Sequence, residues 1–172
     1  LSDGMGVGAR AAEESATTIA LLERLLNAGF NEELSLRTVN NILMLRSGED
    51  SFATVDLVIL DLYAGEAEFV KVGSCTSYIK RGRHVSLIPP PSPPIGIVED
   101  IKVQPVRRRL RDGDLIVMVT DGVTGEKGKS GWLLDLLRQA RTDEPEEMAR
   151  WILAEAGKQG GFHADDMAAL VA

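Results

Sequence analysis

Three acidic motifs with the same form stand at widely separated points of this sequence, each an aspartate next to an apolar strand-like run. They are Asp3-Gly4, Asp121-Gly122 and Asp165-Asp166. Three carboxylates delivered to one edge of a sheet would form a site of hard oxygen donors. Such donors prefer Mg²⁺ or Mn²⁺, and these ions are suited to the chemistry of phosphate groups. The motifs therefore predict a metal site for phosphate chemistry.

A single Asp-Gly pair is weak evidence for such a site, because Asp-Gly is among the commonest turn dipeptides. The sequence contains a further pair, Asp112-Gly113, which we interpret as a plain hairpin turn. The prediction depends instead on the order and the context of the three motifs.

The composition favours one globular domain and excludes several classes of function. The 172 residues are 44% hydrophobic, which is enough apolar material for a core. The net charge of −7 argues against a nucleic-acid partner. The single cysteine excludes an internal disulfide and fits a reducing cytosol, so we expect a cytoplasmic domain. No apolar run approaches about 18 residues, so we expect no membrane contact by this chain.

The hydrophobic periodicity predicts helices at both ends of the chain and strands between them. Apolar residues at helical spacing predict helices over residues 9–28, 36–46, 133–140 and 145–156. Runs rich in Val, Ile, Leu, Phe and Tyr predict strands over 54–63, 67–72 and 77–81, and a last strand over 167–171.

Two further features complete this prediction. Five prolines within residues 88–94 predict an extended crossing loop, after which strand-like sequence resumes at 95–97. Residues 103–110 and 115–120 predict a hairpin around Asp112-Gly113. Runs of strands flanked by paired helices indicate an α+β fold, with helices packed on antiparallel sheets.

Taken together, a series of short motifs resembles the metal-dependent serine/threonine protein phosphatase family, the protein phosphatase 2C (PP2C) type. The resemblance covers nearly the whole chain. No single motif is specific to the family, but the complete set of motifs in this order is. The motifs are Leu1-Ser2-Asp3-Gly4-Met5-Gly6, Gly8-Ala9-Arg10, Val55-Asp56-Leu57, Lys71-Val72-Gly73-Ser74, Tyr78-Ile79-Lys80-Arg81-Gly82, Pro94-Ile95-Gly96-Ile97, Asp114-Leu115, Thr120-Asp121-Gly122 and Asp165-Asp166-Met167.

The resemblance implies an αββα sandwich of two antiparallel β-sheets flanked by helix pairs, and a catalytic centre of two Mn²⁺ or Mg²⁺ ions bridged by a water. Carried over by position, Asp3 bridges the two metals and the Gly4 carbonyl is a ligand. Asp121 and Asp165 hold the other metal, and these three aspartates are the catalytic residues. Asp165 is favoured over Asp166, because the family pattern places the ligand first in its acidic pair.

The start of the chain departs from the family pattern. The family has additional strands before the first Asp-Gly motif, and they carry another acidic residue of the metal centre. This chain starts at that motif with Leu1, so we expect residues 1–172 to be a single phosphatase domain that is an N-terminally truncated fragment of a longer protein. A sheet without those strands would expose an edge that could support a homodimer, and the metal site would be incomplete. If the chain is part of a longer protein, that protein could be anchored to a membrane by another segment, with this domain on the cytosolic side.

The resemblance also implies a substrate, namely phosphoserine on an anti-anti-sigma-type protein in the control of sporulation sigma factors. Two alternatives stay open at this point. The motif Asp3-Gly4-Met5-Gly6-Val7-Gly8 superficially resembles the nucleotide box of an ATP-binding module of the histidine-kinase and anti-sigma type, although that leaves Asp121 and Asp165 unexplained. The other alternative is a catalytically incompetent domain that only binds a partner.

Overall fold

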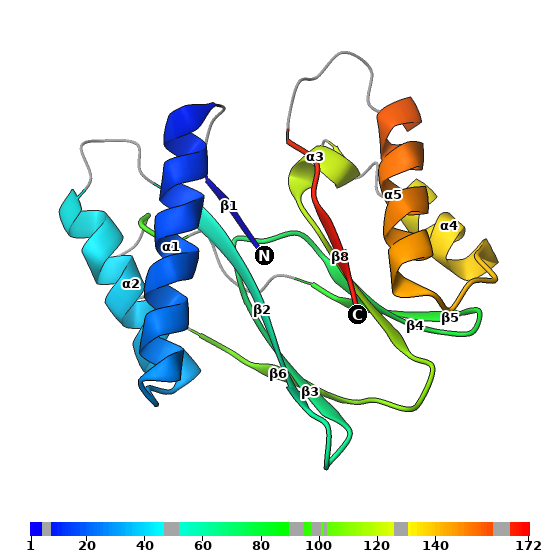
Figure 1. Cartoon of the computed structure of the whole chain (residues 1–172), viewed down its shortest axis with the longest axis horizontal. Helices are drawn as coiled ribbons and strands as arrows, with labels where there is room; N and C mark the ends of the chain where they lie inside the picture. Colours follow the sequence, from blue (N-terminus) through cyan, green and yellow to red (C-terminus); the bar gives the residue numbers. More distant parts are fainter. Residues whose placement is uncertain are drawn as a thin grey trace. The chain divides into compact units, whose positions relative to one another are not determined.

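The chain folds into two compact units, each with its own four-stranded sheet. The structure is a computed structural model that describes residues 1–4, 8–46, 52–89, 95–97, 101, 103–125, 131–159 and 166–172. The first unit comprises Leu1–Leu60, Glu68–Ser74 and Pro90–Arg107, and the second comprises Asp61–Ala67, Cys75–Pro89 and Arg108–Ala172 (Figure 1). The strand orders are β1-β2-β3-β6 in one sheet and β5-β4-β7-β8 in the other.

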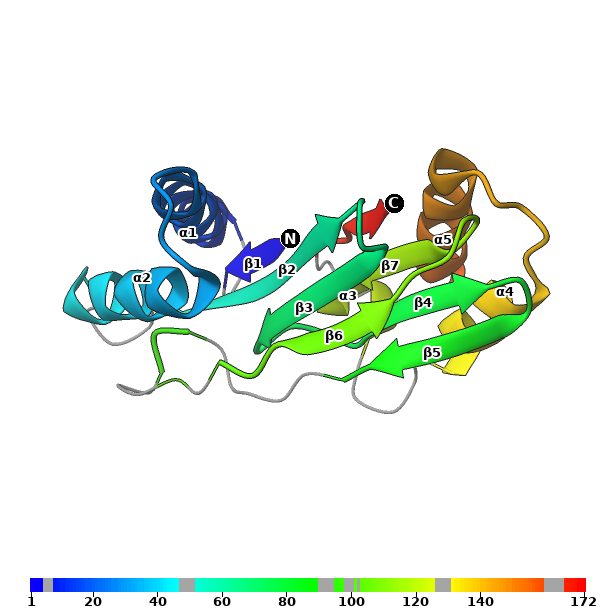
Figure 2. The same ribbon diagram turned by 90° about the horizontal axis from the view of Figure 1, so that it is seen from below.

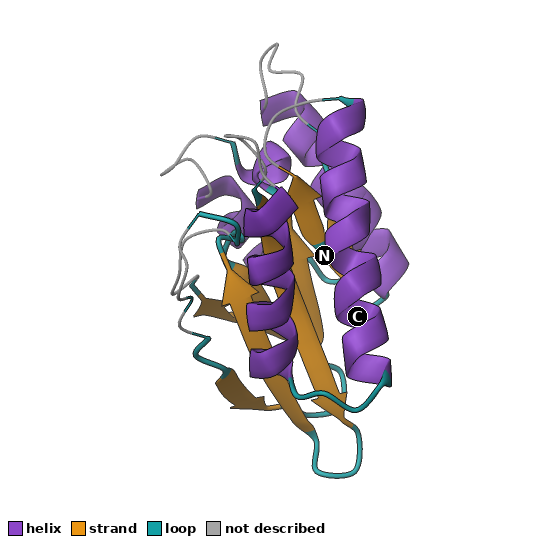
Figure 3. Ribbon diagram, turned by 90° about the vertical axis from the view of Figure 1, so that its left-hand side faces the viewer, coloured by secondary structure: helices purple, strands orange, loops and turns teal. Residues whose placement is uncertain are grey.

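The first sheet and its two helices share one apolar core. The sheet consists of β1 (Ser2–Gly4), β2 (Ala53–Asp61), β3 (Glu66–Val72) and β6 (Val106–Arg109), and the helices are α1 (Ala9–Asn27) and α2 (Glu32–Arg46). Leu22 of α1 and Leu36 of α2 pack in one cluster with Val55, Val70 and Val72 of the sheet. The helices therefore cover a face of β2 and β3, and this side of the unit faces the viewer in Figure 3.

A buried ion pair joins two strands of this sheet. Lys71 of β3 donates to the carboxylate of Asp56 on β2, and both side chains are 1% exposed. Removing either partner would leave a buried charge without its counter-ion, which is strongly destabilising.

The second sheet is covered by helices from the C-terminal half of the chain. Its strands are β4 (Ser77–Arg81), β5 (His84–Ile88), β7 (Leu115–Val119) and β8 (Ala169–Val171), and the helices of this unit are α3 (Asp121–Thr124), α4 (Gly131–Gln139) and α5 (Pro145–Gln159). Figure 2 shows β4 and β5 side by side as a hairpin, with β7 next to β4. All five residues of β7 are buried, and Leu133, Leu137, Met148 and Ile152 of the helices complete its core.

The predicted α+β class with two antiparallel sheets is confirmed, and most predicted elements lie within a few residues of the observed ones. The second helix begins at Glu32 rather than at residue 36, because Asn31 accepts a hydrogen bond from the backbone N–H of Leu34 at 2.8 Å. Such a cap, followed by Glu32 and Glu33 in the first turn, stabilises a helix start that apolar spacing does not reveal.

The predicted hairpin around Asp112-Gly113 is wrong. Strand β6 belongs to the first sheet, whereas β7 is an inner strand of the second, between β4 and β8. Gly113 has a φ of 79°, which is a turn conformation, so the chain does turn at Asp112-Gly113 as predicted. The error arises because turn residues specify a change of direction but not which strand pairs with which. Buried and exposed residues do not alternate along β7, because all of its residues are buried, and this is typical of an inner strand.

Two other strand predictions differ from the structure. The sequence pattern predicts no strand over residues 84–87, but β5 forms there, and its buried Val85 and Ile88 lie in the hairpin with β4. The predicted strand over residues 95–97 is reduced to a single bridge, in which Ile95 exchanges two backbone hydrogen bonds with Ala53. Residues 90–94 of the proline-rich loop lie outside the described residues. In the described ranges, no helix has the length and apolar character needed to cross a bilayer.

An ion pair fixes the turn that leads into β7. Arg81 at the end of β4 donates from Nε to the Asp114 carboxylate at 2.7 Å, and the backbone N–H of Arg111 donates to the same carboxylate at 2.8 Å. The hydrogen bonds from Arg81 hold the pKa of the Asp114 carboxyl below its ordinary value of 3.8. Because the pKa is lower in the folded state, this pair stabilises the fold above pH 3.8 and its contribution is lost as the pH falls through the lowered pKa.

We therefore predict that Asp114→Asn lowers the free energy of unfolding at pH 7 relative to wild type, and that the difference narrows as the pH falls below 3.8. Urea unfolding at a series of pH values measures it. The exposed neighbour serves as a control: Asp112→Asn should leave the pH dependence unchanged. A constant difference across the whole pH range would show that the ionised Asp114 carboxylate is not what stabilises the turn.

Candidate metal centre

The first acidic motif lies on a short strand at the edge of the first sheet. Strand β1 pairs antiparallel with β2, and Asp3 lies opposite Thr54. The backbone N–H of Asp3 donates to Thr54 Oγ1 at 3.0 Å. Asp3 is half-buried. The pairing therefore fixes the backbone from which the Asp3 carboxylate projects.

Gly4 lies so close to helix α1 that no other residue fits there. A Cβ atom built on Gly4 would lie 2.1 Å from the carbonyl oxygen of Ala11. On the same strand, Ser15 of α1 donates from Oγ to the carbonyl oxygen of Ser2 at 3.0 Å. The backbone of β1, including the Gly4 carbonyl group, is consequently held against the first turns of α1.

The second acidic motif follows the buried inner strand of the second sheet. Thr120 continues β7 in an extended conformation, and Asp121 opens the short helix α3. The backbone N–H of Val123 donates to the Thr120 carbonyl at 3.1 Å, and that of Gly125 donates to the Asp121 carbonyl at 2.7 Å. These bonds close the turn while the Asp121 side chain stays exposed.

Thr120 also ties this turn to the C-terminal acidic motif. Its Oγ1 donates to the carbonyl oxygen of Asp166 at 3.1 Å and accepts from the backbone N–H of Ala168 at 3.0 Å. The backbone N–H of Thr120 donates in turn to the Ala168 carbonyl at 3.1 Å. Asp121 follows Thr120 directly, so Asp121 and Asp166 lie at the same end of the sheet, where β8 begins beside α3 (Figure 1).

The predicted ligands that the structure describes thus lie in two groups, one in each unit. Asp3 and Gly4 lie together on β1, and Asp121 lies beside the segment that carries Asp166. Asp165 itself is outside the described residues. Within the described ranges, no three Asp, Glu, His or Cys side chains form a cluster that could hold a metal ion. The assignment of Asp3, Gly4, Asp121 and Asp165 as ligands therefore stays a prediction.

Thr120 was not identified from the sequence as a residue that builds the site. It is only 7% exposed, and its hydroxyl makes two hydrogen bonds that connect the turn at Asp121 with residues 166–168. The signal available in the sequence was a hydroxyl residue between five apolar residues and an Asp-Gly pair. A buried polar residue needs hydrogen-bond partners, but the sequence does not say which segment provides them.

The donor chemistry of these residues fits a hard divalent cation. The candidates are carboxylates and a backbone carbonyl, and oxygen ligands of this kind suit Mg²⁺ or Mn²⁺. His84 is an exposed side chain on β5 and is not part of this donor set. His163 is outside the described residues.

Comparison with known structures defines the class of the protein. The chain has the fold of a PP2C-type phosphatase domain: 99% of it aligns, with a TM-score of 0.88 and 37% identity, to a Bacillus subtilis structure that comprises the PP2C phosphatase domain and a fragment of the regulatory domain of the cell fate determinant SpoIIE. The alignment covers 52% of that structure.

The sequence model of the stage II sporulation protein E (SpoIIE) family matches residues 1–172, and the chain belongs to this family. It is 39% identical over 176 residues to stage II sporulation protein E of Bacillus subtilis (strain 168). That alignment covers 99% of this chain but only 21% of the relative, so the chain spans about a fifth of the length of that protein. The resemblance to the PP2C-type family is thereby confirmed.

A second structure connects this family with manganese. The phosphatase domain of SpoIIE from Bacillus subtilis, presoaked with Mn, is 34% identical to this chain with a TM-score of 0.63. The alignment covers the whole of this chain and 83% of that structure.

The contact of Gly4 with α1 yields a direct prediction. Gly4→Ala would force the Ala11 carbonyl and the β1 backbone apart, and we expect it to lower the free energy of unfolding by about 1–3 kcal/mol. Thermal and urea unfolding measure this change. Gly157→Ala is the control, because it lies in α5 with no atom within 4 Å of the added Cβ. It should instead raise stability by about 0.5–1 kcal/mol. Equal effects of both substitutions would contradict the close approach.

The role of Thr120 yields another prediction. Thr120→Val keeps the side-chain volume but removes the hydroxyl, leaving the Asp166 carbonyl and the Ala168 N–H without that partner. We expect it to lower the free energy of unfolding by about 1–3 kcal/mol, and to weaken Mn²⁺ binding in calorimetric titrations.

The matched control for this change is Thr120→Ser, which retains the hydroxyl and should preserve Mn²⁺ affinity. If the Val and Ser variants bind Mn²⁺ equally well, the hydroxyl does not position the acidic motifs.

Proposed function

We propose that this chain is the catalytic domain of a metal-dependent protein serine/threonine phosphatase. The observation that carries this proposal is the set of hydrogen bonds between Thr120 and the residues Asp166 and Ala168, which brings Asp121 close to Asp166. Membership of the SpoIIE family and the fold of a PP2C phosphatase domain support it.

The roles of the side chains follow from their chemistry. Asp3 would bridge two Mn²⁺ or Mg²⁺ ions, the Gly4 carbonyl would complete that end of the site, and Asp121 and Asp165 would hold the other ion. When bound, the two ions would neutralise charge on the phosphoryl oxygens and lower the pKa of the attacking water. The β1–α1 contact and the Thr120 bonds would fix the ligand positions before substrate arrives, as a rigid support must.

The proposed substrate is phosphoserine on an anti-anti-sigma-type protein, which would connect the chain to the control of sporulation sigma factors. The sporulation role in the name of the matched family supports this assignment. We further propose that the domain acts in the cytosol, as part of a longer protein that is anchored to the membrane elsewhere. Self-association through an exposed sheet edge belongs to the same proposal.

The ATP-binding alternative accounts for less of the molecule. It would use only the glycine-rich start of the chain and assigns no role to Asp121 or to the hydrogen bonds that join it to the C-terminal motif. The fold shared with PP2C phosphatase domains also argues against it. A partner-binding domain without activity differs from our proposal in one measurable respect, metal-dependent turnover.

We predict that hydrolysis of p-nitrophenyl phosphate, by the chain and by the full-length protein, requires Mn²⁺ or Mg²⁺. Asp3→Asn and Asp121→Asn should each lower kcat/KM by roughly a hundredfold or more, the size of effect expected when a stabiliser of transition-state charge is removed. Steady-state rates with and without EDTA measure this. Full turnover in excess chelator would contradict the proposal.

The acidic pair provides a matched control within the same experiment. Asp165→Asn should abolish Mn²⁺-dependent turnover, whereas Asp166→Asn should retain most of it, because Asp166 contributes its backbone carbonyl to Thr120. If Asp166→Asn is the more damaging substitution, the assignment of the ligand within the pair is wrong.

A further inference from the structure

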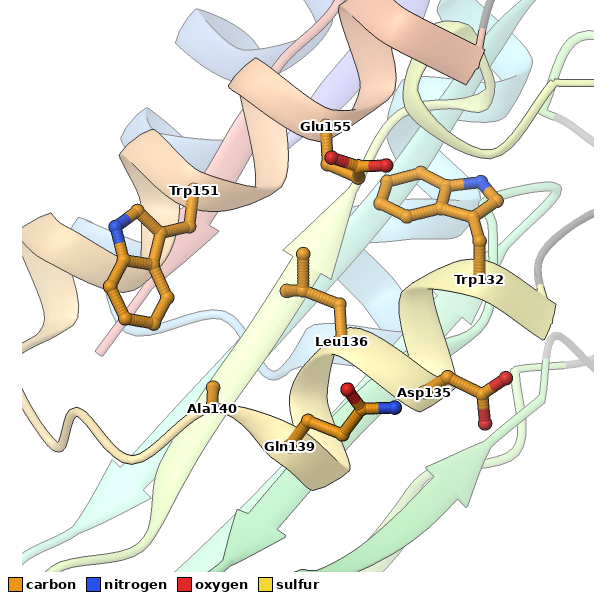
Figure 4. A pocket seen from close by; sticks show the side chains of 7 residues that line it. All are labelled: Trp132, Asp135, Leu136, Gln139, Ala140, Trp151 and Glu155. Carbon is orange, nitrogen blue, oxygen red and sulfur yellow. The ribbon is translucent and has the colours of Figure 1, made fainter.

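A groove lined by both tryptophans of the chain lies between helices α4 and α5. It has a volume of about 470 Å³. Figure 4 shows Trp132 of α4 and Trp151 of α5 on opposite sides of this groove, with Leu136 and Ala140 between them. The carboxylates of Asp135 and Glu155 lie at its rim. We refer to these residues as the tryptophan groove.

Trp132 is a partly buried side chain that packs against the core of this unit and also lines the groove, whereas the core cluster does not include Trp151. The core beneath the helices is completed by Leu133 and Leu137 of α4 and by Met148 and Ile152 of α5, all fully buried. Trp151, in contrast, is 43% exposed. Large aromatic side chains left on a concave apolar surface mark sites of protein binding, where tryptophan and arginine supply most of the affinity.

A second, basic concavity adjoins the tryptophan groove. It has a volume of about 560 Å³ and is lined by Arg83, Arg138, Gln139 and Arg141. Gln139 lines both spaces, so they form one continuous surface. Arg83 comes from the turn between β4 and β5, whereas the others come from the end of α4 and the segment after it. The surface is thus built from separate parts of the sequence.

The charge of this surface is opposite to that of the chain as a whole. Asp135 lies 3.9 Å from Arg138, and Glu155 lies 3.0 Å from Lys158, so each carboxylate at the rim has its own cation. Arg83 and Arg141 are exposed, and in the described part of the chain neither is paired with a carboxylate. They add positive charge to a protein whose net charge is −7. The surface is therefore complementary to an acidic ligand.

This surface is separate from the candidate metal centre. In the pairing of β4 with β7, Lys80 lies opposite Leu115, so the β4–β5 turn that carries Arg83 is at the first residue of β7. Asp121 follows the opposite end of the same strand. Five residues of extended chain span about 17 Å, so Arg83 does not contact a phosphate bound at Asp121.

We propose that the tryptophan groove and the arginine concavity together form a docking surface for an acidic, amphipathic peptide segment of a partner protein. Its apolar side chains would pack between Trp132 and Trp151. Its carboxylates would pair with Arg83 and Arg141, because a guanidinium group binds a carboxylate through two parallel hydrogen bonds. This proposal does not depend on the phosphatase activity.

The shape favours a peptide over a lipid surface. The arginines and tryptophans line hollows rather than a protruding face, and a flat bilayer cannot fill two adjoining hollows. A peptide can place an apolar side chain between the tryptophans and keep its own carboxylates on the arginine side.

The test uses a random dodecapeptide library displayed on phage, selected against the full chain and then against the double variant Arg83→Glu/Arg141→Glu to remove non-specific binders. We expect enrichment of peptides in which Asp or Glu is combined with Leu, Phe or Trp. Synthetic peptides without tryptophan then report binding directly, because Trp132 and Trp151 are the only tryptophans of the chain and their fluorescence monitors the groove.

Labelled versions of these peptides give dissociation constants by fluorescence anisotropy. Trp132→Ala and the double arginine variant should each raise Kd about tenfold or more, in line with the loss of a binding hot spot. Arg83→Gln/Arg141→Gln should give a smaller increase. Arg150→Glu is the matched control, since its side chain is 75% exposed on α5 but lines neither hollow, and it should leave Kd unchanged. Circular dichroism confirms that each variant is folded.

Three outcomes would overturn the proposal: no enrichment of acidic peptides, enriched peptides whose Kd is insensitive to the arginine and tryptophan variants, or a different occupant of the surface. If the chain binds vesicles of phosphatidylcholine and phosphatidylglycerol, and Arg83→Glu/Arg141→Glu abolishes this binding, the occupant is a lipid surface. A second copy of the chain as occupant would appear as a concentration-dependent dimer, in sedimentation equilibrium, that the same double variant dissociates.

Discussion

The hydroxyl group of Thr120 joins two stretches of chain that lie 46 residues apart, and the second unit depends on it for the position of its acidic residues. It donates to the Asp166 carbonyl and accepts from the Ala168 N–H, at the point where β7 ends and β8 begins. A buried hydroxyl with both roles satisfied is costly to remove, because its two partners lose their hydrogen bonds together. The Thr120 hydroxyl therefore acts together with the backbone hydrogen bond from Thr120 to Ala168 and with the pairing of β7 and β8 to fix Asp121 relative to Asp166.

The first unit fixes its acidic motif by a steric constraint instead. Gly4 allows β1 to approach α1 to a distance that any side chain would prevent, and the pairing of Asp3 with Thr54 sets the strand's register. In both units the backbone next to an aspartate is fixed by a neighbouring element, so the carboxylate starts from a defined position. Sites that bind metal depend on such support, since displacements of a few tenths of an ångström change the coordination geometry. Both candidate groups therefore have the fixed backbone that a metal ligand needs.

The sequence allowed the helices and the order of the acidic motifs to be predicted, because both follow from local patterns. Apolar periodicity located α1 and α5 to within three residues at every end. It could not show that Asn31 starts α2 earlier, nor that Asp112-Gly113 connects strands of different sheets, since both depend on contacts made in space. The hydrogen-bond partners of Thr120 could not be predicted from the sequence for the same reason. The ligand set itself came from resemblance to a family, and the described residues establish its backbone support.

In the proposed metal centre, Asp121 and Asp165 bind the same ion. Titrating ¹⁵N-labelled chain with Mn²⁺ tests it directly, because the paramagnetic ion broadens only the amide signals of residues close to it. We predict that the signals of Gly122 and Asp166 broaden together at the lowest Mn²⁺ concentrations, and that Asp121→Asn abolishes both effects. Broadening of Gly122 without Asp166, or first broadening at the exposed Glu146 and Glu147 of α5, would contradict it.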